Sequence, residues 1–326
     1  MNQQPILEIK DLKTHFFTYA GVVKAVDGIN LRINHEEVLG IVGETGCGKS
    51  VTARSVLKLI PEPGKIVSGE IKLNGKDVLS MSDIEINKIR GGQVAMIFQN
   101  PLSSLNPLFT IGEQVSYIIR IHQDVKPIAA RERTVEMFNQ VRLPNPNRLL
   151  NKYPHELSGG QLQRIMIAMA LSCIPQLLIA DEPTTALDVT IQAQILTLML
   201  QLKEETKTSI MLITHDLGVV AEVCDRVVIM YAGRIVEDAP VEQIFQEPLH
   251  PYTKGLMASI PGRNKQEQEL AAISGSVPNL IHPPEGCRFH PRCPNAKEKC
   301  HQEIPALKPH KDGHNIACFL YDQEGQ

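Results

Sequence analysis

The sequence predicts an α/β fold built on a mainly parallel sheet. Short apolar runs typical of buried strands alternate with stretches of helical character, an order that favours parallel strands joined by helices. One such run, residues 38–42, leads into a glycine-rich loop and then into a helix-forming stretch. Hydrophobic residues make up 43% of the chain and charged residues 21%. This composition supports a sizeable core and excludes a largely disordered chain.

Length and charge narrow the class of protein further. A chain of 326 residues suggests about two domains. With 33 Lys and Arg against 36 Asp and Glu, the net charge is −3, so no overall positive charge draws it to nucleic acid or anionic membranes. No apolar run is long enough to span a bilayer, and the start lacks the features of a secretory signal. A cytosolic protein is therefore expected.

The expected elements can be placed along the chain in order. Residues 38–42 indicate a buried strand, and residues 51–60 indicate a helix that stops before Pro61. Residues 70–78 indicate a hairpin, because Asn74-Gly75 supplies the positive φ angles of a tight turn. Residues 100 to about 175 are expected to be mostly helical. Further strands are expected at residues 94–98, 177–180, 210–213, 226–231 and 234–236.

A phosphate-binding loop is predicted at residues 43–50, which fit the pattern G-x-x-x-x-G-K-[ST] between a strand and a helix. The glycines let backbone N–H groups close around phosphate oxygens, and the start of the helix adds partial positive charge. Lys49 is expected to reach the β- and γ-phosphates, and Ser50 to ligate Mg²⁺. The predicted nucleotide-binding residues of this loop are Gly43, Glu44, Thr45, Gly46, Cys47, Gly48, Lys49, Ser50 and Val51.

Two carboxylates follow the predicted strand at 177–180. Asp181 lies at the carboxyl end of that strand, where open α/β sheets bind ligands. A carboxylate there can hold Mg²⁺, and the adjacent Glu182 can polarise an attacking water molecule. An Asp-Glu pair can also simply be a solvated strand end, but the phosphate loop in the same chain favours metal-assisted hydrolysis.

Residues 157–161, Leu-Ser-Gly-Gly-Gln, lie between the phosphate loop and Asp181 and precede an apolar helix. The two glycines permit close approach of the backbone to an anion at the helix start. The segment resembles the signature motif of ATP-binding-cassette (ABC) ATPases, and the resemblance covers residues 6 to about 237. It implies a P-loop NTPase (RecA-like) core with an antiparallel β subdomain and a helical subdomain inserted at about 100–176. The nucleotide-binding domain would then span residues 1–262.

The resemblance also implies roles for single residues. Glu182 and His215, the switch histidine, would orient the attacking water, and Gln99 matches the Q-loop glutamine. Ser50, Gln99 and Asp181 would surround Mg²⁺. An aromatic ring near the N-terminus stacks on adenine in this family; Phe16, Phe17 and Tyr19 are candidates, with Tyr19 preferred. The signature segment would close on the γ-phosphate held by the opposite subunit, through Ser158, Gly160 and Gln161. Residues 186–188 match the D-loop, whose predicted site residue is Asp188.

Three stretches are similar to the oligopeptide and dipeptide importers of this family, and most of all to their "D" type of ATPase subunit: residues 98–107, 230–237 and 250–253. The resemblance implies that ATP binding and hydrolysis drive uptake of di- and oligopeptides. The implied partners are a second ABC ATPase in a heterodimer, two transmembrane permease subunits and an extracytoplasmic solute-binding protein. The chain would be peripheral at the cytoplasmic face of the membrane. Alternatives are nickel or another small solute, a soluble non-transport ABC ATPase, or a metal-binding regulatory subunit.

The C-terminal part of the sequence has a different character. Residues 263–280 are expected to form a linker, and residues 281–326 hold four of the seven cysteines, Cys287, Cys293, Cys300 and Cys318. In a reducing compartment such a group suggests metal before disulfides. The wide spacing leaves an iron–sulfur cluster, zinc, and free or paired thiols open. The resemblance implies a [4Fe–4S] cluster on these four cysteines. Six basic and six acidic residues balance in this segment, so nucleic acid is not an expected partner.

Overall fold

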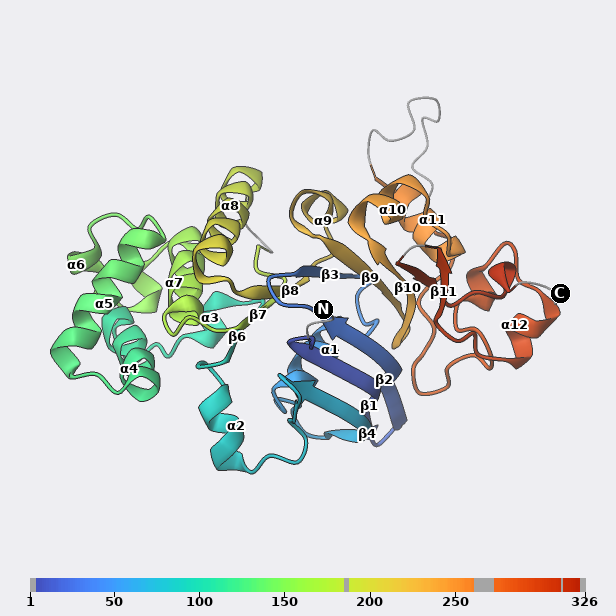
Figure 1. Cartoon of the computed structure of the whole chain (residues 1–326), viewed down its shortest axis with the longest axis horizontal. Coiled ribbons are helices and arrows are strands. Elements are labelled where there is room, and N and C mark those ends of the chain that lie inside the picture. Colours follow the sequence, from blue (N-terminus) through green and yellow to red (C-terminus); the bar gives the residue numbers. More distant parts are fainter. Residues whose placement is uncertain (1–3, 185–187, 261–272, 312, 323–326) are drawn as a thin grey trace. The chain divides into compact units, whose positions relative to one another are not determined.

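The computed structural model describes residues 4–184, 188–260, 273–311 and 313–322 (Figure 1). The chain divides into two compact units, which are described separately. The first unit consists of Met1–Ile6, Ile33–Glu36 and Ser80–Ile213, and the second of Leu7–Arg32, Glu37–Leu79 and Thr214–Gln326.

The first unit contains three parallel, fully or largely buried strands: β6 (Val94–Ile97), β7 (Leu177–Asp181) and β8 (Ser209–Ile213). Strand β7 lies between the other two, with Ile97 opposite Ala180 and Asp181 opposite Ile213. Parallel strands that are buried on both faces read as continuous apolar runs. The strands expected at 94–98, 177–180 and 210–213 are thus confirmed to within one residue at each end.

The helices expected between residues 100 and about 175 are present in the first unit, and Figure 1 shows α4 to α7 gathered in one helical group. Helix α4 begins with a capping box in which Thr110 and Glu113 satisfy each other's backbone N–H groups. Pro127 occupies the first turn of α5, where its missing N–H has no cost. The helices of this unit are α2 (Asp83–Ile89), α3 (Pro101–Ser104), α4 (Ile111–Gln123), α5 (Pro127–Gln140), α6 (Pro146–Leu149), the 3₁₀ turn η1 (Pro154–Glu156), α7 (Gly159–Leu171) and α8 (Val189–Thr206).

The second unit contains an antiparallel sheet and a mixed group of strands. The antiparallel sheet has the order β2-β1-β4-β5 and comprises β1 (Leu7–Thr18), β2 (Gly21–Ile33), β4 (Gly64–Leu73) and β5 (Lys76–Asp77). Strands β4 and β5 form the expected hairpin around Asn74-Gly75. In the mixed group, β3 (Val38–Val42) is parallel to β9 (Arg226–Tyr231), which is antiparallel to β10 (Arg234–Pro240).

Helix α1 (Lys49–Val56) differs from the expected helix at 51–60 at both ends. It begins two residues earlier, immediately after the left-handed Gly48. It ends four residues earlier because Lys58 adopts a left-handed φ of +52° and the N–H of Leu59 turns back to the carbonyl of Arg54. Such a turn ends a helix before any proline is reached. The other helices of the second unit are α9 (Leu217–Val223), α10 (Val241–Gln246), α11 (Pro251–Ala258) and α12 (Glu298–Gln302).

The C-terminal segment is built onto the mixed group of strands. Strand β12 (His314–Ile316) pairs with β10, and β11 (Lys308–Lys311) pairs with β12. The buried carboxylate of Glu237 on β10 accepts a hydrogen bond from Nε2 of His314, with 2.7 Å between the two atoms. The sequence predicted a Cys-rich extension organised by a metal, and this is not supported. Strand pairing and a buried His–Glu contact join the segment to the second unit instead.

An aromatic cluster in the core of the second unit contains His250, Tyr252, Tyr231 and Phe289. His250 is 1% exposed, and its Nδ1 accepts the backbone N–H of Tyr252 at the start of α11. Burial lowers the pKa of His250 from 6.5 to about 4, against the opposing effect of the Glu237 carboxylate. The folded protein therefore keeps this imidazole neutral.

The depressed pKa of His250 predicts a loss of stability in mild acid. Between about pH 6.5 and pH 4 the unfolded chain binds a proton that the folded chain does not, so the free energy of unfolding falls as the pH falls. The contribution is about 3 kcal/mol over that window. Urea unfolding at pH 7 and pH 4.5 measures it. His250→Asn retains an acceptor for the N–H of Tyr252 but does not titrate, so it is expected to show a smaller pH dependence. An unchanged pH dependence would contradict this account.

Candidate functional site

The predicted phosphate loop lies in the second unit, between β3 and α1. Lys49 is 6% exposed, and its Nζ donates to the carbonyl oxygens of Gly43 at 2.7 Å and Glu44 at 3.1 Å. The ammonium group is therefore held by the carbonyl groups at the start of its own loop. Such a lysine is already placed against the backbone that would enclose a phosphate.

The glycines of this loop are required by close approach to neighbouring backbone. Gly48 has a φ of +103°, and a Cβ there would lie 2.3 Å from the carbonyl oxygen of Ala25 on β2. A Cβ on Gly43 would lie 2.2 Å from the carbonyl oxygen of Met230 on β9. The carbonyl of Cys47 also accepts the N–H of Gly233, with 2.9 Å between N and O. The backbone of the second unit thus packs closely against the loop, which fits a phosphate-binding loop.

His215 and the candidate adenine-stacking rings also belong to the second unit. The N–H of Thr214 donates to the carbonyl of Ile41 on β3, the strand that leads into the loop, so His215 follows directly after a residue bonded to that strand. His215 is exposed. Tyr19 occupies the turn between β1 and β2 and is fully exposed, and Phe17 is 47% exposed. Adenine stacking by Tyr19 stays a prediction.

In the first unit, Gln99 and Glu182 are in direct contact. Nε2 of Gln99 donates to Oε2 of Glu182 at 2.8 Å. The register of β6 and β7 explains the contact, because the two residues follow the paired residues Ile97 and Ala180 by the same two positions. Asp181, between Ala180 and Glu182, is 1% exposed. The amide of Gln99 and the carboxylate of Glu182 therefore meet at the carboxyl ends of two parallel strands, and the magnesium and hydrolysis roles of Gln99, Asp181 and Glu182 stay predictions.

Glu182 also has an unusual backbone conformation. Its φ is +48°, in the left-handed region that non-glycine residues rarely adopt, and its N–H donates to the carbonyl of Ile213 at 2.9 Å. Strained residues of this kind are concentrated at functional sites. The hydrogen bond to Ile213, together with the one from Gln99, fixes both the backbone and the side chain of Glu182.

The signature segment forms the start of α7. Ser158 caps this helix through a capping box with Gln161, with distances of 3.4 Å from Gln161 N to Ser158 Oγ and 3.1 Å from Ser158 N to Gln161 Oε1. Gly160 lies close to α8, since a Cβ there would be 3.3 Å from Cγ2 of Ile191. Asp188 caps α8 through the N–H of Ile191 at 2.9 Å. The starts of α7 and α8 therefore lie together; residues 186 and 187 of the D-loop match are outside the described residues.

The prediction of an iron–sulfur or zinc site on the four C-terminal cysteines was wrong. Among the residues that the structure describes, no group of three or more His, Cys, Asp or Glu side chains is arranged to hold a metal ion. Cys287, Cys293, Cys300 and Cys318 are all free thiols. Burial raises the pKa of Cys318 to about 11.

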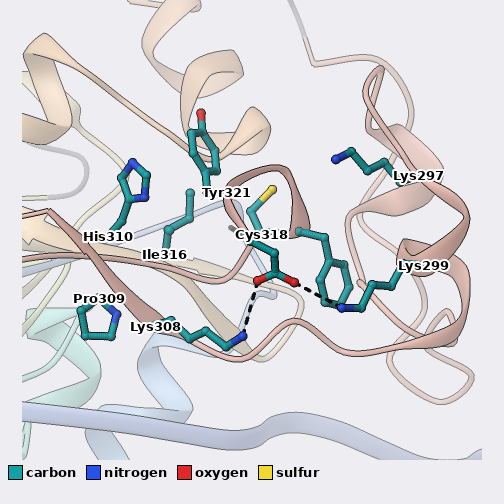
Figure 2. Close-up of a pocket in the computed structure, with 10 residues that line it drawn as sticks. Lys297, Lys299, Lys308, Pro309, His310, Ile316, Cys318 and Tyr321 are labelled. Atoms are coloured by element: carbon teal, nitrogen blue, oxygen red, sulfur yellow. Dashed lines mark hydrogen bonds and ion pairs between the residues drawn. The ribbon is translucent and has the colours of Figure 1, made fainter. Parts of the chain in front are cut away.

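Two of these cysteines have polar or pocket contacts that the structure describes. Cys300 is 7% exposed, and its Sγ accepts the backbone N–H of Lys297 at the start of α12. Cys318 instead lines a cavity of about 740 Å³, which Figure 2 shows together with Lys299 and Lys308. These two lysines form ion pairs with the carboxylate of Asp322, at 3.2 and 3.4 Å. The surroundings of Cys318 are thus those of a surface pocket.

The sequence did not reveal two residues that contact the phosphate loop from the C-terminal part of the second unit. Arg292 pairs with the carboxylate of Glu44, and the hydroxyl of Tyr252 accepts the backbone N–H of Glu44 at 2.9 Å. Tyr252 belongs to the His-Pro-Tyr-Thr segment at residues 250–253. That segment indicated a similarity to peptide importers but gave no indication of a contact with the phosphate loop. For Arg292 no local pattern indicates a partner that is 248 positions away.

Comparisons with known proteins agree with these features. The family described as "ABC transporter" matches residues 26–185, and the family described as "Oligopeptide/dipeptide transporter, C-terminal region" matches residues 236–300. Among solved structures, a post-hydrolysis dimer of the ATP-binding cassette MJ0796 with ADP and Pi is 28% identical, with a TM-score of 0.66. That similarity covers 72% of this chain and 98% of the other. Among the described residues, no helix is both long and apolar enough to cross a membrane.

Curated relatives are similar over nearly the whole chain. The oligopeptide transport ATP-binding protein AppD of Bacillus subtilis is 51% identical over 98% of each chain. The oligopeptide transport ATP-binding protein OppD of Haemophilus influenzae is 48% identical over 97% of each. The dipeptide transport ATP-binding protein DppD of Bacillus subtilis is 46% identical over 99% of this chain and 97% of its own. The chain therefore belongs to the ABC transporter family, as an ATPase that uses ATP with Mg²⁺ and is related to the ATP-binding proteins of oligopeptide and dipeptide transport.

Proposed function

We propose that this chain is the ATP-hydrolysing subunit of an importer that couples ATP binding and hydrolysis to uptake of di- and oligopeptides across the cytoplasmic membrane. The observation that supports it most directly is the near full-length similarity to oligopeptide and dipeptide transport ATP-binding proteins, combined with a supported phosphate loop and the Gln99–Glu182 contact. Residues 1–262 would form the nucleotide-binding domain. The chain would act as a peripheral subunit at the cytoplasmic face of the membrane.

The proposed chemistry divides among the predicted site residues. Residues 43–51 would hold the phosphates of ATP through backbone N–H groups, with Lys49 on the β- and γ-phosphates. Ser50, Gln99 and Asp181 would surround Mg²⁺, which stabilises the charge that develops on the phosphoryl group. Glu182 would polarise the attacking water, and His215 would orient it. Tyr19 would stack on adenine, and Ser158, Gly160, Gln161 and Asp188 would face the nucleotide held by a second cassette.

A cavity in the helical group supports the proposed permease partners. It has a volume of about 690 Å³ and is lined from α4 and α5 and the residues just before α4, including Phe109, Tyr117 and Arg120. Phe109 is 51% and Tyr117 62% exposed, and the adjacent Leu108 is 80% exposed. Large apolar side chains gathered around a hollow are typical of a surface that receives another protein. We propose that a cytoplasmic helix from each of two transmembrane permease subunits is received at this kind of surface, one on this chain and one on its partner ATPase.

We propose that the working assembly contains a second, different ABC ATPase and receives its solute from an extracytoplasmic binding protein. The exposed start of α7 around Ser158 supports pairing with another cassette, because a capped helix start with adjacent glycine can approach an anion bound elsewhere. The dimeric ATP-binding cassette among the structural relatives is a further support.

Transport in proteoliposomes tests this proposal. The chain would be reconstituted with its partner ATPase and permease subunits, and uptake of a labelled dipeptide, a labelled pentapeptide and Ni²⁺ would be measured with the binding protein present. The expected result is ATP-dependent uptake of a peptide, abolished by omitting the chain. Uptake of Ni²⁺ without peptide would contradict the solute class. RNA-stimulated ATPase activity without any uptake would contradict the transport role itself.

A further inference from the structure

We propose that Arg292, in the C-terminal segment, is a positioning residue for the phosphate loop: it fixes Glu44 and thereby sets the affinity of this chain for ATP. The inference rests on the proposed function, because it concerns the same nucleotide site. The C-terminal segment would then contribute directly to nucleotide binding, in addition to its strand pairing with the second unit. The segment would act through one side chain that reaches from η2 (His290–Arg292) to the loop.

The contact between Arg292 and Glu44 is bidentate. Nη1 lies 2.7 Å from Oε2 of Glu44, and Nη2 lies 3.1 Å from Oε1. The Arg292 side chain is 5% exposed and that of Glu44 is 28% exposed. A fork-to-fork pair with this geometry fixes both the position and the orientation of the carboxylate. Because solvent is largely excluded from the guanidinium, the pair is stronger than an ion pair on an open surface.

Arg292 is itself held in place before it meets Glu44. Its Nε donates to the carbonyl of Ser274 at 2.9 Å, and its Nη2 donates to the carbonyl of Ile273 at 3.2 Å. Nη1 also donates to the hydroxyl of Tyr231 at 3.3 Å, and the guanidinium carbon lies 5.8 Å from the centre of that ring. The five N–H groups of arginine form a rigid fork. Because two carbonyl groups and the Tyr231 ring hold the guanidinium in place, the carboxylate of Glu44 that pairs with it is held in one position.

Glu44 passes this constraint on to the loop. Its backbone N–H donates to the hydroxyl of Tyr252 at 2.9 Å, and its carbonyl oxygen accepts Nζ of Lys49 at 3.1 Å. Side chain, N–H and carbonyl of one residue are therefore all occupied, and the last of these contacts leads to the lysine that would bind phosphate. The pairing also compensates a negative charge that would otherwise repel the phosphates of a bound nucleotide. Loss of Arg292 would both loosen the loop and leave that charge uncompensated.

Nucleotide affinity of the full-length chain tests the inference. The affinity for ATP would be measured by isothermal titration calorimetry for the wild type, Arg292→Gln, Glu44→Gln and the double variant. Kd for ATP is expected to rise about tenfold in Arg292→Gln, the effect of losing one charge-assisted hydrogen bond. The double variant is expected to bind no more weakly than Arg292→Gln alone, because removing the Glu44 charge also removes the repulsion. Arg292→Lys, which keeps the charge without the fork, is expected to lie between wild type and Arg292→Gln.

Two further measurements separate positioning from general stability. The melting temperature is determined for every variant, because a merely structural arginine would lower it without changing Kd well below the transition. Lys311→Gln is the matched control, since it removes an exposed ion pair with Glu247 from the same segment and is expected to leave Kd unchanged. An unchanged Kd in Arg292→Gln, or independent multiplicative effects in the double variant, would overturn the inference. Wild-type protein that binds no ATP would instead contradict the proposed function.

Discussion

Replacing Glu182 by glutamine is expected to reduce ATP hydrolysis by about 10²- to 10⁴-fold while ATP is still bound, as for the removal of a positioned general base. Glutamine has nearly the same size and retains one oxygen toward Nε2 of Gln99, so the contact at 2.8 Å can persist. What is lost is the negative carboxylate that polarises water. The variant is expected to accumulate with ATP bound and the two cassettes closed, and transport is expected to stop with hydrolysis.

Phosphate release from ATP under single-turnover conditions, in parallel with ATP binding, measures the effect of Glu182→Gln. Glu204→Gln serves as the matched control, because Glu204 is a 64%-exposed carboxylate on α8 of the same unit, paired with Lys203 on the surface. It is expected to hydrolyse ATP at the wild-type rate. If Glu182→Gln retained more than a tenth of that rate, another group would have to polarise the water, and the role proposed for Glu182 would be wrong.

The second large effect is expected for Lys49→Ala, which should weaken ATP binding by about 10²-fold or more, the size found when a buried, hydrogen-bonded charge is truncated. Lys49 is almost fully buried, and its ammonium group is held on the carbonyl oxygens of Gly43 and Glu44. Alanine removes the charge opposite the phosphates and leaves those two carbonyl groups without their donor. We therefore expect the loss of activity in Lys49→Ala to come mainly from weaker ATP binding and less from a lower folding stability.

Equilibrium binding of ATP and of ADP distinguishes the contributions at Lys49. The expected loss is greater for ATP than for ADP, because the lysine would contact the γ-phosphate that ADP lacks. Lys72→Ala is the control from the same unit, since Lys72 forms a partly exposed pair with Glu70 on β4, and binding is expected to be unaffected. Equal losses for the two nucleotides would place the lysine nearer to the α- and β-phosphates than proposed.

Some parts of the candidate site have a geometry that the local sequence pattern determines. A glycine pattern between a strand and a helix predicted the phosphate loop, and the clashes that a Cβ would make at Gly43 and Gly48 explain why glycine is needed. Gln99 was named from the resemblance to ABC ATPases, and its contact with Glu182, 83 positions away, was not predicted. The structure explains the contact, because adjacent parallel strands end at the same edge.

Other features depend on contacts between residues that are far apart in the sequence, and the spacing of residue types along the chain does not predict these contacts. The strand β1 was not predicted, although Leu7 and Ile9 alternate with polar residues, because register shifts between Lys10 and Thr14 interrupt the period of two. The four cysteines are close in sequence, but among the described residues they do not form a group arranged to hold a metal ion. Each feature depends on the rest of the fold.

Strand β11, at the edge of the mixed group of strands, has a sequence that disfavours pairing with another chain. Strand β10 is paired on both sides, by β9 and β12, so the exposed edge of this group of strands belongs to β11. All four residues of β11, Lys-Pro-His-Lys from Lys308 to Lys311, are exposed. Lysine and proline are the residues that natural proteins place on sheet edges to prevent pairing with another chain. The sheet thus ends in a strand that is unsuited to further pairing, which disfavours edge-to-edge aggregation of this unit.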